Sequence, residues 1–101
     1  TYTRHYPVTF NDPDRADFCG DVAASIVGEA DLTRKAPPLM GGEDFSFMLE
    51  QRPGAFIFIG NGPSAGLHHP RYDFCDDAIA FGVSYWVALA QRALPLTAPT
   101  N

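Results

Sequence analysis

The feature that most constrains the fold is a helical pattern near the carboxyl end of the sequence that is apolar on every side. Asp76 or Asp77 can cap this helix, and Pro95 follows its end. Spaced at about 100° per residue, its large apolar side chains surround nearly the whole axis: Ile79, Phe81, Val83, Tyr85, Trp86, Val87, Leu89 and Leu94. Such a helix is buried on several sides, and a chain of 101 residues can hardly cover it alone.

Two segments in the first third of the sequence have clear patterns. Residues 1–10 alternate as a strand does, and because Pro7 cannot donate to a ladder, this strand should lie at a sheet edge. Residues 13–30 repeat apolar side chains every three or four positions, which indicates a helix with one buried face. Asp12 can cap this helix, and Pro13 suits its first position.

A second strand is predicted at residues 55–59, which are apolar on both faces as in a strand buried within a sheet. Residues 60–63 close this strand as a turn rich in glycine. Because helices and strands alternate along the chain, the sequence predicts the α/β class.

The charge balance argues against two classes of partner. Acidic side chains outnumber basic ones by 12 to 7, and the net charge of −5 repels phosphate backbones and anionic headgroups. The longest nearly uninterrupted apolar stretch, residues 78–90, is too short to cross a hydrocarbon core of about 30 Å. We therefore expect neither nucleic acid nor a membrane as a partner.

Cysteine usage and the first residue carry weaker signals. Cys19 and Cys75 are too few for a disulfide-stapled scaffold, which favours reduced thiols in a cytoplasmic protein. Neither belongs to a Cys-x-x-Cys pair, so we expect no redox motif. The sequence begins at Thr1 and not at an initiator methionine, and the strand-like alternation starts at this first residue. We therefore expect the chain to be a piece of a longer protein.

The loop after the second strand is the densest candidate for chemistry. Residues 67–77 hold two histidines, three aspartates and one cysteine, and loops after the carboxyl ends of strands are where open α/β sheets hold ligands. Histidine is the commonest metal ligand among side chains that titrate near neutrality, and carboxylates often orient it. The spacing matches no zinc-finger or HExxH pattern. A metal site and a polar loop that caps the next helix both remain open on this pattern.

A turn at residues 41–44 is the second candidate. Gly41 and Gly42 permit a tight turn, and Glu43 and Asp44 then fall in the first turn of a short helix, where carboxylates are favoured. Phe45, Met48 and Leu49 would supply the buried face of that helix. By itself this pattern is also typical of an ordinary helix start.

Taken together, these two segments resemble a known family. The string MGGEDFSFMLEQRPGAFIFIGNG, followed by LHHPRYDFCDDAIAFG, resembles the C-terminal part of the aminoacylase and hippurate hydrolase family of metal-dependent amidohydrolases. Auxin-conjugate hydrolases and carboxypeptidase-G-like metallopeptidases are related to that family. The stretch YPVTFND is similar as well, so the resemblance covers about residues 2 to 92.

The resemblance implies a domain organisation. Members have a catalytic α/β domain, with helices packed on a mixed sheet, into which a smaller lid domain that often dimerises is inserted. Residues 1–10 would then be the last strand of the lid, and residues 11–14 the hinge. Residues 15–95 would be the C-terminal portion of the metallopeptidase-type catalytic domain, followed by a flexible tail at 96–101. We expect a homo-oligomer.

The resemblance also assigns a metal ligand. Members bind two divalent ions, usually zinc, manganese or cobalt, and His68 corresponds to their C-terminal metal ligand by its place in the His-x-Pro motif. His69 occupies a variable position, and no ligand role is carried onto it.

Acidic residues near this motif are expected to support the site. Glu43 and Asp44 match the family's Gly-Gly-Glu-Asp-Phe turn, which implies a role in orienting metal ligands or substrate. Asp73 and Asp76 match a segment that would brace the histidine loop. Cys75 stands where the family usually has Asn.

The implied reaction is hydrolysis of the amide bond of N-acyl amino acids such as hippurate. Two cations polarise the scissile carbonyl and lower the pKa of a water molecule, and a glutamate base moves the proton to the leaving amine. In the family, that base and most metal ligands come from the N-terminal half, which these residues do not match. We therefore expect the 101-residue chain alone to contain no catalytic residue, to retain no metal and to be inactive.

Two alternatives remain. An acidic, non-catalytic α/β interaction module could bury its last helix against a second copy of itself. A one-metal site could form from His68, His69 and Cys75 within this chain.

Overall fold

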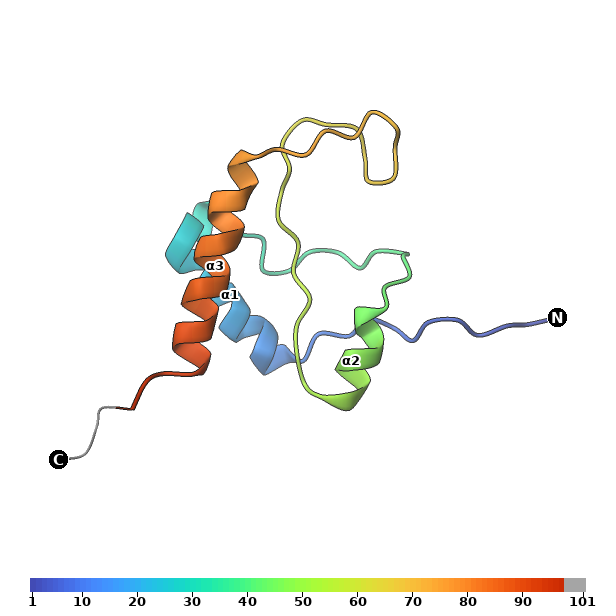
Figure 1. The fold of residues 1–101 in the computed structure, drawn as a ribbon. Helices are drawn as coiled ribbons and strands as arrows, with labels where there is room; N and C mark the ends of the chain where they lie inside the picture. Colours follow the sequence, from blue (N-terminus) through green and yellow to red (C-terminus); the bar gives the residue numbers. More distant parts are fainter. Residues whose placement is uncertain (98–101) are drawn as a thin grey trace. The chain divides into compact units, whose positions relative to one another are not determined.

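The computed structural model describes residues 1–97 and contains four helices in that range (Figure 1). They are α1 (Pro13–Val27), the short 3-10 helix η1 (Glu29–Asp31), α2 (Phe45–Gln51) and α3 (Asp77–Ala93). The chain divides into two compact units, Thr1–Ile57 and Phe58–Asn101. The domain boundaries expected from the family resemblance stay predictions.

Helix α1 begins as its sequence predicts. The side chain of Asp12 accepts a hydrogen bond from the backbone N–H of Arg15 at 3.1 Å, and Pro13 occupies the first helical position. The helix ends at Val27 rather than at residue 30, because Gly28 takes a φ of 81° and leaves the helical conformation. Val22 is its fully buried residue.

The segment after α1 is held against the helix by one arginine. The Arg34 guanidinium donates to both carboxylate oxygens of Glu29 and, at 3.0 Å, to Asp21 on α1. The hydrogen bonds from Arg34 hold the pKa of the Glu29 carboxyl below its usual range. Arg34 also lies over Gly20, where an added Cβ would stand 2.6 Å from the guanidinium nitrogen Nη1. Gly20 therefore leaves room in α1 for this arginine.

Neither predicted strand is present in residues 1–97. Residues 1–10 and 55–59 lie outside any helix or strand, so the mixed sheet and the last strand of a lid are not confirmed. A strand is defined by a ladder of main-chain hydrogen bonds to a neighbour, and the described part of the chain forms no such ladder.

One side chain bonds to residues 55–59 in the way a neighbouring strand would. The amide of Asn11 donates to the carbonyl of Phe56 at 3.0 Å and accepts from the N–H of Phe56 at 2.7 Å. The N–H of Asp12 also donates to the carbonyl of Gly54 at 2.9 Å. The predicted burial of this segment on both faces is wrong for Ile57 and Ile59, which are 43% and 54% exposed. Burial on two faces requires a layer on each side of a sheet.

Helix α2 begins at Phe45, so Glu43 precedes the helix and Asp44 is its N-cap residue. Its buried residue is Ser46, whose hydroxyl donates to the carbonyl of Glu43 at 2.6 Å. Of the apolar residues predicted for its buried face, Phe45 and Leu49 are partly buried, whereas Met48 is exposed.

Aromatic contacts fix α2 within its unit. The ring of Phe47 lies 5.7 Å from that of Tyr6, and Phe45 lies 5.6 Å from Phe56, measured between centroids. A Cβ added to Gly42 would stand 3.2 Å from the Tyr6 ring, so this glycine lets the ring approach the backbone before α2. The residues around α2 thus hold two otherwise unstructured segments.

Helix α3 has the bounds that the sequence predicts, within one residue at its end. Ala78 and Tyr85 are buried, whereas several large apolar side chains on other faces are exposed: Ile79, Phe81, Val83, Trp86 and Val87. No helix in residues 1–97 has the length and hydropathy needed to cross a membrane. The tail expected at residues 96–101 lies outside the described residues from 98 onward.

Candidate functional site

The predicted histidine loop is closed at its base by the side chain of Asn61. The amide nitrogen Nδ2 of Asn61 donates to the carbonyl of Asp73, and the N–H of Cys75 donates to Oδ1 of Asn61, both at 2.7 Å. In Figure 1 the two ends of this loop, before and after residue 68, run side by side ahead of α3. The intervening residues therefore form a closed loop.

Ser64 adds a second tie between the same two ends. Its hydroxyl oxygen accepts from the N–H of Asp73 at 3.0 Å, so both the N–H and the carbonyl of Asp73 are bonded to the other end of the loop. Cys75 takes part through its backbone N–H, so this pairing does not depend on the side chain at position 75.

Two consecutive turns form the tip of the loop. The N–H of His69 donates to the carbonyl of Gly66 at 3.2 Å, and the N–H of Tyr72 donates to the carbonyl of His69 at 2.9 Å. His68 is the third residue of the first turn and has a φ of 66°, the left-handed region that non-glycine residues seldom occupy. A positive φ at that position alone is the geometry of a type II turn.

The two histidines of the tip differ in what their rings contact. Nδ1 of His69 accepts from the backbone N–H of Arg71 at 3.0 Å, so that nitrogen is used within the loop. The ring of His68 is exposed and has no hydrogen-bond partner within residues 1–97. His68 is therefore the imidazole of this loop with both nitrogens free to bind.

The predicted acidic residues lie in different surroundings. Asp73 and Asp76 belong to the same unit as His68, but within residues 1–97 neither carboxylate bonds to the His68 ring. Asp73 braces the loop through its main chain, and Asp76 is the N-cap residue of α3 without a side-chain capping bond. A bracing role for the two carboxylates stays a prediction.

The turn before α2 lies in the other unit. Glu43 accepts at Oε1 from the N–H of Phe45 at 3.2 Å, and its carbonyl accepts from the N–H and the hydroxyl of Ser46. Glu43 thus closes the start of α2, whereas Asp44 makes no side-chain capping bond. Their predicted role toward substrate or metal ligands stays a prediction.

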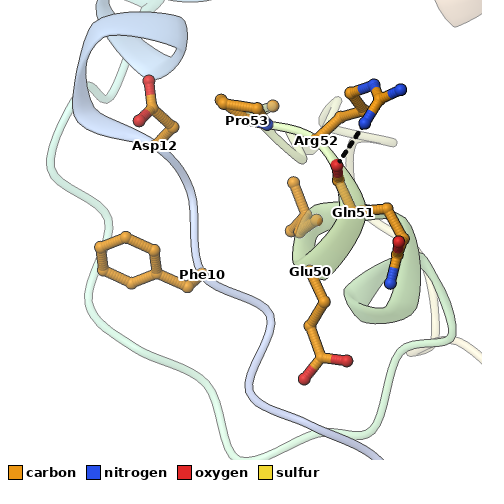
Figure 2. A pocket seen from close by; sticks show the side chains of 8 residues that line it. Phe10, Asp12, Glu50, Gln51, Arg52 and Pro53 are labelled. Atoms are coloured by element: carbon orange, nitrogen blue, oxygen red, sulfur yellow. Dashed lines mark hydrogen bonds between the residues drawn. The ribbon is translucent and has the colours of Figure 1, made fainter.

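A pocket of about 280 Å³ lies in the first unit (Figure 2), lined by Phe10, Asp12, Leu49, Glu50, Gln51, Arg52, Pro53 and Gly54. Figure 2 shows Phe10 and Asp12 on the segment before α1 and Glu50 to Pro53 at the end of α2, where Arg52 donates to the carbonyl of Gln51 at 2.9 Å. None of the residues predicted to carry chemistry lines this pocket. We therefore assign no function to this pocket.

Comparison with known proteins now decides the family. The model of Peptidase family M20/M25/M40 matches residues 1–92 of the 101. The chain belongs to this family. No solved structure is significantly similar to the chain.

Several curated proteins are similar to this M20 chain. It is 36% identical over 88 residues to a hippurate hydrolase of Campylobacter jejuni, covering 87% of the chain and 23% of that protein. It is 32% identical over 94 residues to the IAA-amino acid hydrolase ILR1-like 4 of Arabidopsis thaliana, covering 88% of the chain and 21% of that protein.

An N-acetyldiaminopimelate deacetylase of Shouchella clausii is 29% identical over 94 residues, covering 93% of the chain and 25% of that protein. The chain thus spans between about a fifth and a quarter of the length of these three relatives.

The metal donors in the described part of this M20 chain form no complete centre. Within residues 1–97, no three side chains of His, Cys, Asp and Glu gather to hold a metal ion. The alternative site of His68, His69 and Cys75 is therefore not formed in this structure. His68 fits the part of a single ligand, because its imidazole is exposed and unbonded. Cys19 and Cys75 are unpaired and partly buried.

Sequence reasoning missed the residues that close the loop. Asn61 lies between two glycines and was interpreted as part of an ordinary turn, and Ser64 was assigned no role. The available signal is an asparagine at the start of a long loop, followed by Gly62, whose φ is 74°. Its partners are 12 and 14 positions away, beyond the reach of local patterns.

Proposed function

We propose that the protein carrying this M20 chain is a metal-dependent amidohydrolase that cleaves the amide bond of N-acyl amino acids, and that His68 is one ligand of its metal centre. The observation that carries the proposal is the exposed, unbonded imidazole of His68 on a turn whose base is closed. Similarity to a hippurate hydrolase and to an IAA-amino acid hydrolase supports the substrate class.

The predicted residues would hold the metal ions, support the loop or orient the substrate. Two divalent ions, zinc, manganese or cobalt, would supply Lewis-acid activation of the amide carbonyl and of water. His68 would hold one of them, while Asp73 and Asp76 keep its loop in place. Glu43 and Asp44 would orient ligands or substrate from the turn before α2.

The 101-residue chain alone is not expected to form a complete metal centre. His68 is a single donor, and no group of three potential ligands forms within residues 1–97. The 101-residue chain by itself is therefore expected to bind no metal ion stoichiometrically and to hydrolyse no N-acyl amino acid. The location proposed for the protein is the cytoplasm, where cysteines stay reduced.

The test is hydrolysis of N-benzoylglycine by the full-length protein with added Mn²⁺, beside His68→Asn and His69→Asn. Asparagine tolerates a positive φ, so His68→Asn removes the imidazole and keeps the turn. At position 69 an asparagine oxygen can still accept from the N–H of residue 71. We expect His68→Asn to lose at least about 100-fold in kcat/KM and His69→Asn to change little. Equal losses in the two variants, or no loss in His68→Asn, would contradict the assignment.

A second candidate is a self-associating interaction module, and the exposed apolar side chains of α3 favour it: Ile79, Phe81, Val83, Trp86 and Val87. It predicts that the full-length protein hydrolyses no N-acyl amino acid, that His68→Asn equals the parent, and that the mass in sedimentation rises with concentration. A homo-oligomer that also hydrolyses N-benzoylglycine would fit the amidohydrolase and rule out a purely structural module.

A further inference from the structure

We infer that Asn61 is a positioning residue that sets the place of the His68 imidazole by closing the loop on which it stands. The inference rests on the proposed function, in which His68 holds a metal ion. It concerns a residue to which neither the motif nor the family resemblance assigned a role.

The geometry is that of a side chain acting as a strand neighbour. One planar amide both donates to the carbonyl of residue 73 and accepts from the N–H of residue 75, each at 2.7 Å. In a parallel ladder the N–H and C=O of one residue bond in the same way to residues two apart on the neighbouring strand. The Asn61 amide thus fixes the direction of the chain at residues 73–75 as well as its distance.

The rest of the loop cannot provide this constraint. The bonds at its tip, from His69 to Gly66 and from Tyr72 to His69, are local and shape only the two turns. Within residues 1–97, the hydrogen bonds that join the loop's two ends are the two of Asn61, at 2.7 Å, and the longer one from the N–H of Asp73 to the Ser64 hydroxyl, at 3.0 Å. Without Asn61 the turns can keep their shape, while the position of His68 relative to the rest of its unit becomes variable.

Loss of the amide also leaves a partly buried donor unpaired. The N–H of Cys75 lies in a partly buried contact, and Asn61 is its acceptor. An unpaired donor of this kind favours opening of the loop base to water. A ligand whose supporting contacts are removed typically costs about 10- to 100-fold in metal affinity, which sets the expected size of the effect.

The experiment compares Asn61→Ala with Asn11→Ala in the full-length protein. Asn11 is a matched control, because its amide makes the same kind of paired bonds, to Phe56 in the other unit. Two readouts are taken: hydrogen exchange of peptides covering residues 62–75 in the metal-free protein, and Mn²⁺ affinity by chelator competition.

For Asn61→Ala we expect about tenfold faster exchange in residues 62–75, as loss of two ordinary hydrogen bonds implies, and about 10- to 100-fold weaker Mn²⁺ binding. Asn11→Ala should change neither readout. Unchanged exchange, or faster exchange with unchanged affinity, would overturn the inference. So would an equal loss of affinity in Asn11→Ala.

Asn61→Asp covers the case in which the alanine variant does not fold. It keeps an acceptor for the N–H of Cys75 and loses the donor to Asp73. Exchange should therefore be faster and Mn²⁺ binding weaker, each by less than in Asn61→Ala, and no change in either would overturn the inference.

His68→Asn separates this inference from the proposed function. If His68→Asn leaves Mn²⁺ affinity unchanged, the ligand assignment fails, whereas the exchange result for Asn61→Ala still decides whether Asn61 closes the loop.

Discussion

His68 combines a left-handed backbone with an imidazole that has no hydrogen-bond or ion-pair partner in the described part of the chain. The left-handed region costs a non-glycine residue roughly 1–2 kcal/mol. Asparagine or glycine would suit the third position of this turn better. Histidine at such a position is therefore better explained by what its ring binds than by what its backbone prefers.

The turn predicts how stability responds to substitution at residue 68. In the metal-free protein, His68→Asn should change the free energy of unfolding by less than about 0.5 kcal/mol, because asparagine tolerates the positive φ. His68→Val should lower it by at least about 1 kcal/mol, because a β-branched side chain clashes in that region. Urea unfolding measures both. Equal stabilities would mean that the turn does not hold residue 68 at positive φ.

Glu29 gives a pH-dependent prediction. Arg34 lowers the pKa of the folded carboxyl, so its contribution to stability is present above about pH 4.3, the unperturbed value, and is lost as pH falls through the lower folded pKa. A ¹³C NMR titration should give Glu29 a midpoint below that of an unperturbed glutamate. In Arg34→Met the midpoint should rise toward the unperturbed value. The same midpoint in both proteins would show that the guanidinium does not bond to Glu29 in solution.

Sequence reasoning found His68 and missed Asn61 for one physical reason. The His-x-Pro motif is a local string, whereas the role of Asn61 depends on backbone groups 12 and 14 residues away. Its flanking glycines indicated a turn and could not indicate which distant groups its amide would bond. The imidazole was therefore predictable, and the contact that closes its loop was not.

At the scale of elements, the helices were predictable because their signals are local. The Asp12 cap and Pro13 predict the start of α1, and α3 begins and ends within a residue of its predicted bounds. The end of α1 was predicted at residue 30 and lies at Val27, because Gly28 takes a positive φ. The strands were not confirmed, because a strand exists only beside a partner. Residues 55–59 have the composition of a buried strand, but the described residues form no ladder with them.

Gly20 and Arg34 give a coupled prediction for α1. Gly20→Ala should raise helix stability by about 1 kcal/mol in an Arg34→Ala background, where the space above the helix is empty. In the native background the new Cβ would stand 2.6 Å from Nη1, so Arg34 has to move away from Asp21 and the gain should be smaller. Thermal unfolding of the four proteins of this cycle measures the coupling. Additive effects would show that Arg34 does not lie over Gly20.

For the whole molecule, most of the apolar surface of α3 is uncovered in the described residues, as its all-round pattern suggested. The site is likewise incomplete, because no group of three potential metal ligands gathers around His68 in the described residues. The family was recognisable from two motifs in their order, but the assembled centre was not predictable, since this chain spans only about a fifth to a quarter of its relatives.

The exposed face of α3 predicts how the 101-residue chain behaves alone. Its sedimentation coefficient should rise with concentration, because Val83, Trp86 and Val87 favour burial against a second copy. Trp86→Asp should weaken this association, since it places a charge on that face. Lys35→Asp is a control, because it changes charge at an exposed site outside the helices. A chain that stays monomeric across the concentration range, or an equal effect of both variants, would contradict the prediction.

The paired bonds of Asn61 also affect how the protein ages chemically. An asparagine followed by glycine deamidates when the next backbone nitrogen attacks its side-chain carbon, and Gly62 offers no Cβ to hinder that attack. While both amide atoms are bonded, the side chain is held away from this geometry. Conversion of Asn61 to aspartate on storage, followed by peptide mass spectrometry, should therefore be slow in the intact protein and faster in Ser64→Ala. The extent of deamidation at Asn61 would then report how often the loop that holds His68 opens.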